Sequence, residues 1–277
     1  MCTSTFRRRT FSALLGASLA WFGGGALADH SWGNYHWAGS GTSFTLALGD
    51  NVSQAWDAYL ATASVEWNRS GVLETTIVGG GTRPKTCKPT AGRVEVCSER
   101  YGYNGWLGIA QIWISGGHIT QAVTKLNDNY FGTAKYNTQG WRNLVMCQEV
   151  GHTFGLDHQD EEFSNGNLGT CMDYTSNPDA DPINWYPNAH DYEQLEQIYA
   201  HSDGTTAVAQ VGKGQAAAAG SEHVSVGTAQ WGRLVRSTNH GRTETFELDL
   251  GGGGKMFTHV IWADPEDEPG VPERGRR

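Results

Sequence analysis

Apolar residues recur at helical spacing in several parts of the chain. Residues 53–68 place two tryptophans, a tyrosine, a leucine and an alanine on one helical face, after a Ser or Asn cap. Residues 139–154 and 191–200 carry similar apolar stripes. The pattern also predicts that residues 118–131 begin as a helix.

Other runs predict strands. Residues 73–78 predict a strand that ends in three glycines, and residues 106–114 are apolar at most positions. A strand of the second kind is expected to be covered on both faces. Residues 243–250 alternate apolar and polar positions, and a glycine turn leads into residues 255–262. This last pattern is typical of a β-hairpin.

The order of these elements predicts an α+β domain over residues 29–203, with a long irregular stretch at residues 155–190. Long connections in compact domains are often functional. Residues 204–221 are rich in Gly and Ala and predict a linker, with a short helix as the alternative. Residues 222–264 then form an expected small β module, and residues 265–277 an expected charged tail.

The start of the chain predicts an export signal. Three arginines at positions 7–9 precede a short apolar run at residues 11–22, and an A-x-A site ends at Ala28. We therefore expect cleavage near Ala28 and a protein that is secreted, either periplasmic or extracellular; a buried helix at residues 1–28 is the alternative. No apolar run approaches the roughly 18 residues of a spanning helix.

Composition and charge narrow the remaining classes. The chain has 277 residues, of which 38% are hydrophobic, so it has material for a core. A formal charge of −9 and the lack of a basic stretch argue against a nucleic-acid partner. Five cysteines are too few for a disulfide scaffold. We expect a monomer.

The segment most suggestive of chemistry is Gln148-Glu149-Val150-Gly151-His152-Thr153-Phe154-Gly155-Leu156-Asp157-His158. Positions 148 and 152 would lie one turn apart on one helical face, as two ligands of a zinc-protease helix do. Glu149 is rotated by about 100°, so its carboxylate can reach a metal-bound water instead of the metal. Gly155 permits a left-handed turn that brings His158 back as a third ligand, with a fourth position open for water.

This segment resembles the metzincin signature H-E-x-x-H-x-x-G-x-x-H, with Gln148 in place of the first histidine. Residues 170–174 resemble the Met-turn, with Met172 as its methionine and Tyr174 as the following tyrosine. The likeness covers roughly residues 44–200 and is closest to matrixin-like bacterial secreted metzincins.

The resemblance implies a zinc metalloprotease: a twisted mixed sheet, an active-site helix and an exported endopeptidase acting on proteins or peptides. Glu149 would be the general base for a metal-activated water, and Tyr174 would steady the oxyanion or act as a further ligand. Residues 106–114 would form the edge strand that pairs with an extended substrate.

Gln148 leaves three interpretations open, because zinc prefers imidazole, thiolate or carboxylate ligands. Its amide oxygen binds zinc in a weaker site; another residue, His118 or His190, completes the ligand set; or the protein is a pseudoprotease that binds peptides or proteins. The presence of Glu149 favours the first two.

The cysteines suggest two bridges in an exported chain. Cys87 and Cys97 bracket a short loop. Cys147 and Cys171 directly precede Gln148 and Met172, so a bridge would tie the helix to the Met-turn; free thiols or a thiolate ligand are the alternatives.

An acidic segment adds one more candidate site. Its members are Asp157, Asp160, Glu161 and Glu162. Calcium binding is one interpretation, but the EF-hand spacing is missing, which favours a solvated acidic loop.

Overall fold

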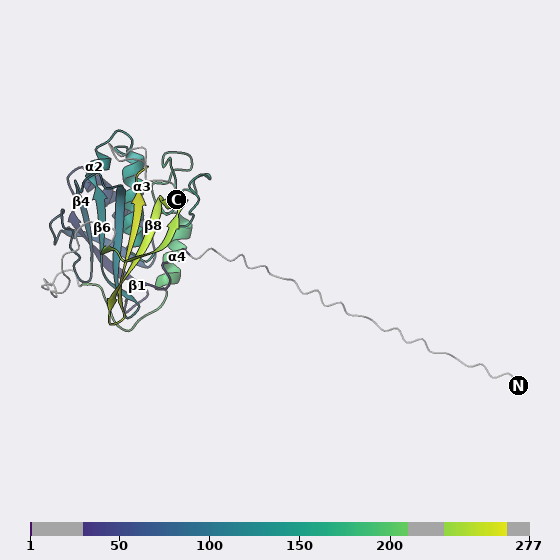
Figure 1. The fold of residues 1–277 in the computed structure, drawn as a ribbon. Coiled ribbons are helices and arrows are strands. Elements are labelled where there is room, and N and C mark those ends of the chain that lie inside the picture. The colour runs from purple at the N-terminus through teal and green to yellow at the C-terminus, as the bar shows by residue number, and fades with distance from the viewer. Residues whose placement is uncertain (2–29, 210–229, 265–277) are drawn as a thin grey trace.

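A mixed β-sheet organises the described part of the chain (Figure 1). The computed structural model describes residues 1, 30–209 and 230–264. The strands are β1 (His36–Trp37), β2 (Phe44–Asn51), β3 (Leu73–Gly79), β4 (Val94–Glu99), β5 (Trp106–Ser115), β6 (His118–Asn127), β7 (Arg233–Thr238), β8 (Thr243–Gly251) and β9 (Gly254–Trp262). The helices are α1 (Asp57–Trp67), α2 (Asp128–Phe131), α3 (Gln139–His152) and α4 (Ala189–Tyr199), with a 3₁₀ turn at Asn239–Gly241.

The expected export signal, the expected tail and most of the expected linker lie outside the described residues. The strands that are described follow the order β3–β2–β4–β6–β5–β9–β8–β7, and β1 pairs with the start of β6. Strands β2, β3, β4 and β6 are parallel, whereas β5 runs antiparallel to β6. A mixed sheet with few helices agrees with the α+β class expected from the sequence.

Helices α1 and α3 pack against each other, α1 against β3 and α3 against β5 and β6. The predicted stripe of α1 is confirmed, since Leu60, Ala63 and Trp67 are buried. The predicted cap is wrong: Trp56 precedes the helix and makes no side-chain cap hydrogen bond. In α3, the hydroxyl of Thr138 accepts from the backbone N–H of Trp141 and satisfies one free donor of the first turn.

The prediction that residues 118–131 begin as a helix is wrong. They form β6, followed by the short helix α2. Strand β6 pairs with β4 on one side and β5 on the other, and its several β-branched residues suit a pleated strand. The pattern also missed β2 and β4. Each carries a buried polar residue, Asn51 at the end of β2 and Glu95 within β4, and Asn51 Nδ2 donates to Glu95 Oε2 across 2.7 Å.

The predicted C-terminal hairpin is present as β8 and β9, joined by glycines with positive φ. Strand β9 pairs with β5 along almost its whole length, and Figure 1 shows the yellow hairpin beside the teal strands. The interpretation of β5 as an edge strand is therefore wrong, because β6 and β9 occupy both of its sides. The expected β module continues the sheet of the preceding domain; its boundary at residue 222 remains a prediction.

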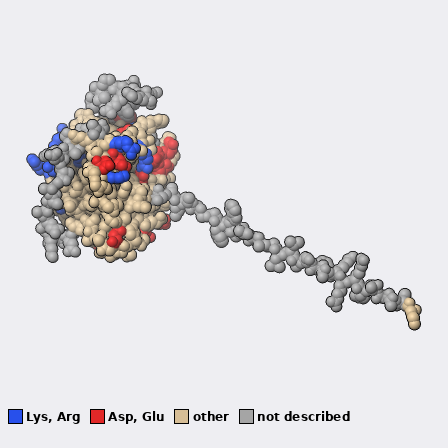
Figure 2. Space-filling view, turned by 60° about the horizontal axis from the view of Figure 1, so that its bottom comes forward, with Lys and Arg blue, Asp and Glu red and all other residues tan. Residues whose placement is uncertain are grey.

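Both expected disulfides are present, Cys87–Cys97 and Cys147–Cys171. No helix among the described residues is long and apolar enough to cross a bilayer. Charged side chains of both signs gather close together on the face shown in Figure 2, and much of the rest of that face is uncharged.

Replacing Trp67 with alanine should lower the free energy of unfolding by about 3–5 kcal/mol, as expected when a large buried ring leaves a cavity. Trp67 is 0% exposed, and its Nε1 donates to the carbonyl oxygen of Cys147 in α3 at 3.2 Å. Urea unfolding measures the change. Val65→Ala is the matched control on the same helix, because Val65 is 62% exposed. An equal loss in both variants would contradict this role for Trp67.

Candidate metal centre

The end of α3 and the turn after it bring two histidines together. Gly155 has φ +92°, and a Cβ there would lie 2.3 Å from the carbonyl oxygen of Tyr35, so the turn requires glycine. The chain then doubles back. Nε2 of His158 lies 3.1 Å from Nε2 of His152, although His152 is helical and His158 is not.

A third histidine comes from the C-terminal hairpin. The His259 ring centroid lies 3.9 Å from that of His152 and 4.6 Å from that of His158. One ligand atom from each of the three rings falls within a 4.8 Å cluster. The pairing register of β9 with β5 determines where His259 lies. His259 pairs with Ala110 of β5, and Ala110 is two residues from Gly108, which faces α3. A slip of one residue would turn His259 to the opposite face.

The three imidazoles are in the form that binds metal. Burial lowers the pKa of each ring, to about 4 for His158, and the neighbouring rings lower the pKa values of His152 and His259 further. Nδ1 of His152 lies 2.9 Å from the carbonyl oxygen of Leu156. A carbonyl only accepts, so Nδ1 carries the hydrogen and Nε2 presents its lone pair toward His158.

Glu149 lies against this cluster. Its Oε2 is 3.7 Å from Nδ1 of His259, and a Cβ on Gly108 would come within 2.9 Å of its Oε1. Among the residues that the structure describes, neither carboxylate oxygen has a hydrogen-bond partner, and burial raises the pKa of Glu149. A buried carboxylate without donors is costly unless a cation or water is beside it.

Gln148 faces the Met-turn segment. Its Nε2 donates to the carbonyl oxygen of Cys171 across 2.8 Å, while its buried Oε1 has no hydrogen-bond partner. The amide nitrogen therefore has a structural partner, and the oxygen remains the atom available to a metal.

Met172 and Tyr174 also lie close to the histidines. Sδ of Met172 is 2.8 Å from the position that a Cβ on Gly151 would take, directly before His152. The ring centroid of Tyr174 is 3.9 Å from that of His158, and burial raises the pKa of its phenol. The tyrosine is therefore neutral at physiological pH.

The two histidines proposed to replace Gln148 lie elsewhere. His118 packs against His36, and His190 stacks on His30. The residue that sequence reasoning missed is His259. Its one signal is a histidine within the apolar run of residues 256–262, where a buried polar group needs a partner.

The acidic segment does not support a calcium site. Asp157 pairs with Arg236, which also reaches Glu161 at 3.2 Å. Asp160 accepts from the backbone N–H of Glu162 across 2.8 Å, so protein donors hold these carboxylates.

No protein-family model matches the sequence, and no curated protein matches it. The fold is similar to solved structures, among them the following two. One is myroilysin, with a TM-score of 0.36 and 12% identity, covering 62% of this chain and 98% of that chain. The other is high choriolytic enzyme 1, a hatching-enzyme zinc-protease from Oryzias latipes (medaka fish), with a TM-score of 0.32 and 10% identity, covering 60% and 94%. Likeness at this level leaves the function to be argued from the chain's own residues.

The donor set fits zinc. Three buried neutral imidazoles match the nitrogen ligands that catalytic zinc takes, with a fourth position left for water or substrate. A cation or its water at this point would satisfy the oxygens of Glu149, which have no hydrogen-bond partner among the described residues.

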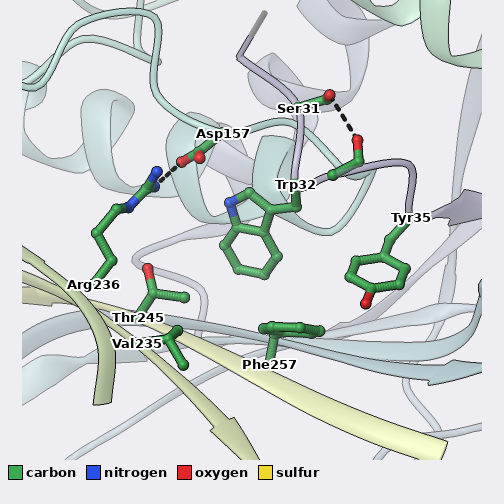
Figure 3. A pocket seen from close by; sticks show the side chains of 9 residues that line it. Ser31, Trp32, Tyr35, Asp157, Val235, Arg236, Thr245 and Phe257 are labelled. Atoms are coloured by element: carbon green, nitrogen blue, oxygen red, sulfur yellow. Dashed lines mark hydrogen bonds and ion pairs between the residues drawn. The ribbon is translucent and has the colours of Figure 1, made fainter. Parts of the chain in front are cut away.

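A pocket of about 300 Å³ lies beside the cluster (Figure 3). Trp32, Tyr35 and Phe257 give it aromatic walls, and Arg236 pairs with Asp157 at its side. The Trp32 ring stacks on His152 with centroids 5.4 Å apart. The pocket therefore lies against the outer side of the indole that covers the histidines.

Proposed function

We propose that this protein is an exported zinc-dependent endopeptidase of metzincin-like type. The observation that carries the proposal is the convergence of His152, His158 and His259 beside Glu149. His259 would be the third zinc ligand in place of Gln148. This is the second of the three interpretations of Gln148, in which another residue completes the ligand set, but the residue is neither His118 nor His190. The two disulfides favour an oxidising compartment.

His152, His158 and His259 would hold the zinc. Zinc held by these residues would polarise a scissile carbonyl and lower the pKa of water toward neutrality. Glu149 then accepts the proton from water and passes it to the leaving amine. Tyr174, neutral and beside His158, would donate a hydrogen bond to the oxyanion once its hydroxyl leaves Thr238 and Thr243, with which it interacts in this structure. Gln148 anchors the segment that carries Met172.

Access to this centre requires movement. His152, His259 and Glu149 are each 0% exposed. Strand β9 fills the side of β5 on which an extended peptide was expected to pair. A substrate therefore enters only after Trp32 or the β8–β9 hairpin shifts, and the aromatic pocket beside Trp32 is the proposed point of approach.

Elemental analysis of the exported protein, paired with hydrolysis of denatured casein, tests the proposal. We expect at least one zinc per chain and cleavage that stops on treatment with a chelator and returns with zinc. Zinc-free protein that cleaves equally well would overturn the metal mechanism. Protein that binds peptides without zinc or cleavage would favour the pseudoprotease.

A further inference from the structure

A second group of histidines lies where β1, the start of β6 and the segment after α4 meet. Nε2 of His36 and Nε2 of His201 are 3.1 Å apart. Oδ1 of Asp203 lies 3.3 Å from the first and 3.2 Å from the second. Nε2 of His118 is 4.0 Å from the same oxygen. Three imidazole nitrogens thus surround one carboxylate oxygen.

Backbone groups orient two members of this group. Nδ1 of His36 lies 2.7 Å from the carbonyl oxygen of Asn34, so Nδ1 carries the hydrogen. In the neutral ring, Nε2 then presents a lone pair toward Asp203. The other carboxylate oxygen, Oδ2 of Asp203, accepts from the backbone N–H of Gly39 at 2.8 Å. Outer hydrogen bonds of this kind are what orient metal ligands.

Hydrogen bonds within the group do not satisfy it while the rings are neutral. The lone pair of His36 Nε2 faces both Oδ1 of Asp203 and Nε2 of His201. One hydrogen on His201 Nε2 can serve only one of these two acceptors well. An additional proton, a water molecule or a cation would satisfy the remaining lone pair.

The spacing fits a metal. In a tetrahedral zinc site with bonds of 2.0–2.2 Å, neighbouring ligand atoms are separated by about 3.3 Å. The three separations among His36, His201 and Asp203 are 3.1, 3.2 and 3.3 Å. We propose that His36, His201 and Asp203 hold a second zinc ion, and that His118, whose Nε2 lies 4.0 Å from Oδ1 of Asp203, is the side chain available as a fourth ligand, which would close the site and make it structural.

The site is reachable from solvent. The side chain of His201 is 46% exposed, and a pocket of about 430 Å³ is lined by both His36 and His201. The ligands come from distant parts of the sequence, so a metal would fasten β1 to the sheet and to the segment after α4. Strand β1 also carries Trp37, whose Nε1 donates to the carbonyl oxygen of Thr153 at 2.8 Å, next to His152.

Zinc chloride titration of the metal-stripped exported protein tests this site, read by elemental analysis and by thermal unfolding. We expect His201→Ala and Asp203→Asn each to bind one zinc fewer than the wild type. At free zinc about 100-fold above the dissociation constant, each should unfold about 5–10 °C lower than the wild type. His240→Asn, in an exposed turn with φ 55°, is the matched control and should match the wild type.

The test compares the zinc content per chain of the wild type with that of each variant. This difference does not depend on whether the first centre holds zinc. If the first centre holds no zinc, the wild type still exceeds His201→Ala by one equivalent. An equal zinc content would overturn the second site, and a protonated histidine–Asp203 ion pair would explain the geometry. Loss of one zinc without a change in thermal unfolding would overturn its structural role.

Discussion

His259→Phe is expected to weaken zinc binding at the proposed centre of His152, His158 and His259 by at least about 100-fold. The change removes both ring nitrogens but keeps an aromatic ring in a position that is 0% exposed. Loss of partners that only orient zinc ligands already costs about 10–100-fold in affinity, so loss of a ligand should cost more. Competition with a chromophoric chelator measures the affinity, and casein hydrolysis should fall with it.

Gln148→Leu is the matched comparison on the helix. It removes the amide oxygen and also the hydrogen bond to the Cys171 carbonyl, so the protein should lose about 1–3 kcal/mol of stability. Its zinc affinity should stay within about tenfold of the wild type. The reverse result, with zinc retained in His259→Phe and lost in Gln148→Leu, would assign the ligand role to the glutamine and leave His259 as a buried neighbour.

Glu149→Gln should lower the rate of peptide hydrolysis by about 10²–10⁴-fold while leaving the zinc content unchanged. The amide has nearly the same shape as the carboxylate but cannot accept the proton from water. The carboxylate has no protein hydrogen-bond partner to lose, so the fold should tolerate the change.

A comparison of kcat and KM sharpens this test. A group that acts as the base lowers kcat with little change in KM. Glu193→Gln, at an exposed position of α4, is a control for the effect of removing a negative charge. Undiminished hydrolysis by Glu149→Gln would remove Glu149 from the mechanism.

Local geometry made part of the candidate centre predictable. Residues three or four apart share a helical face, so the positions of Gln148 and His152 follow from α3 alone. Gly155 was predicted to turn the chain back, and its φ of +92° fits that turn. The cysteine positions likewise predicted both disulfides.

Pairing between distant strands was not predictable in the same way. The sequence indicated the β8–β9 hairpin but not the strand with which the hairpin pairs. The backbone N–H and C=O groups along a strand edge are the same whatever the side chains. Strand β6 was mistaken for the start of a helix although its β-branched residues suit a strand, because its pairing with β4 and β5 is not visible in the local pattern.

The sequence by itself determined the helix with Glu149 and His152, the turn to His158 and a Met-turn-like segment, since each depends on short-range backbone geometry. Only the tertiary structure decided that β9 pairs with β5 and in which register. That register places His259 against the other two imidazoles, because side chains of a strand alternate between its two faces. Gln148 stands where the metzincin signature has a histidine, and His259 is the third histidine beside His152 and His158. No local sequence pattern connects His259 with Gln148.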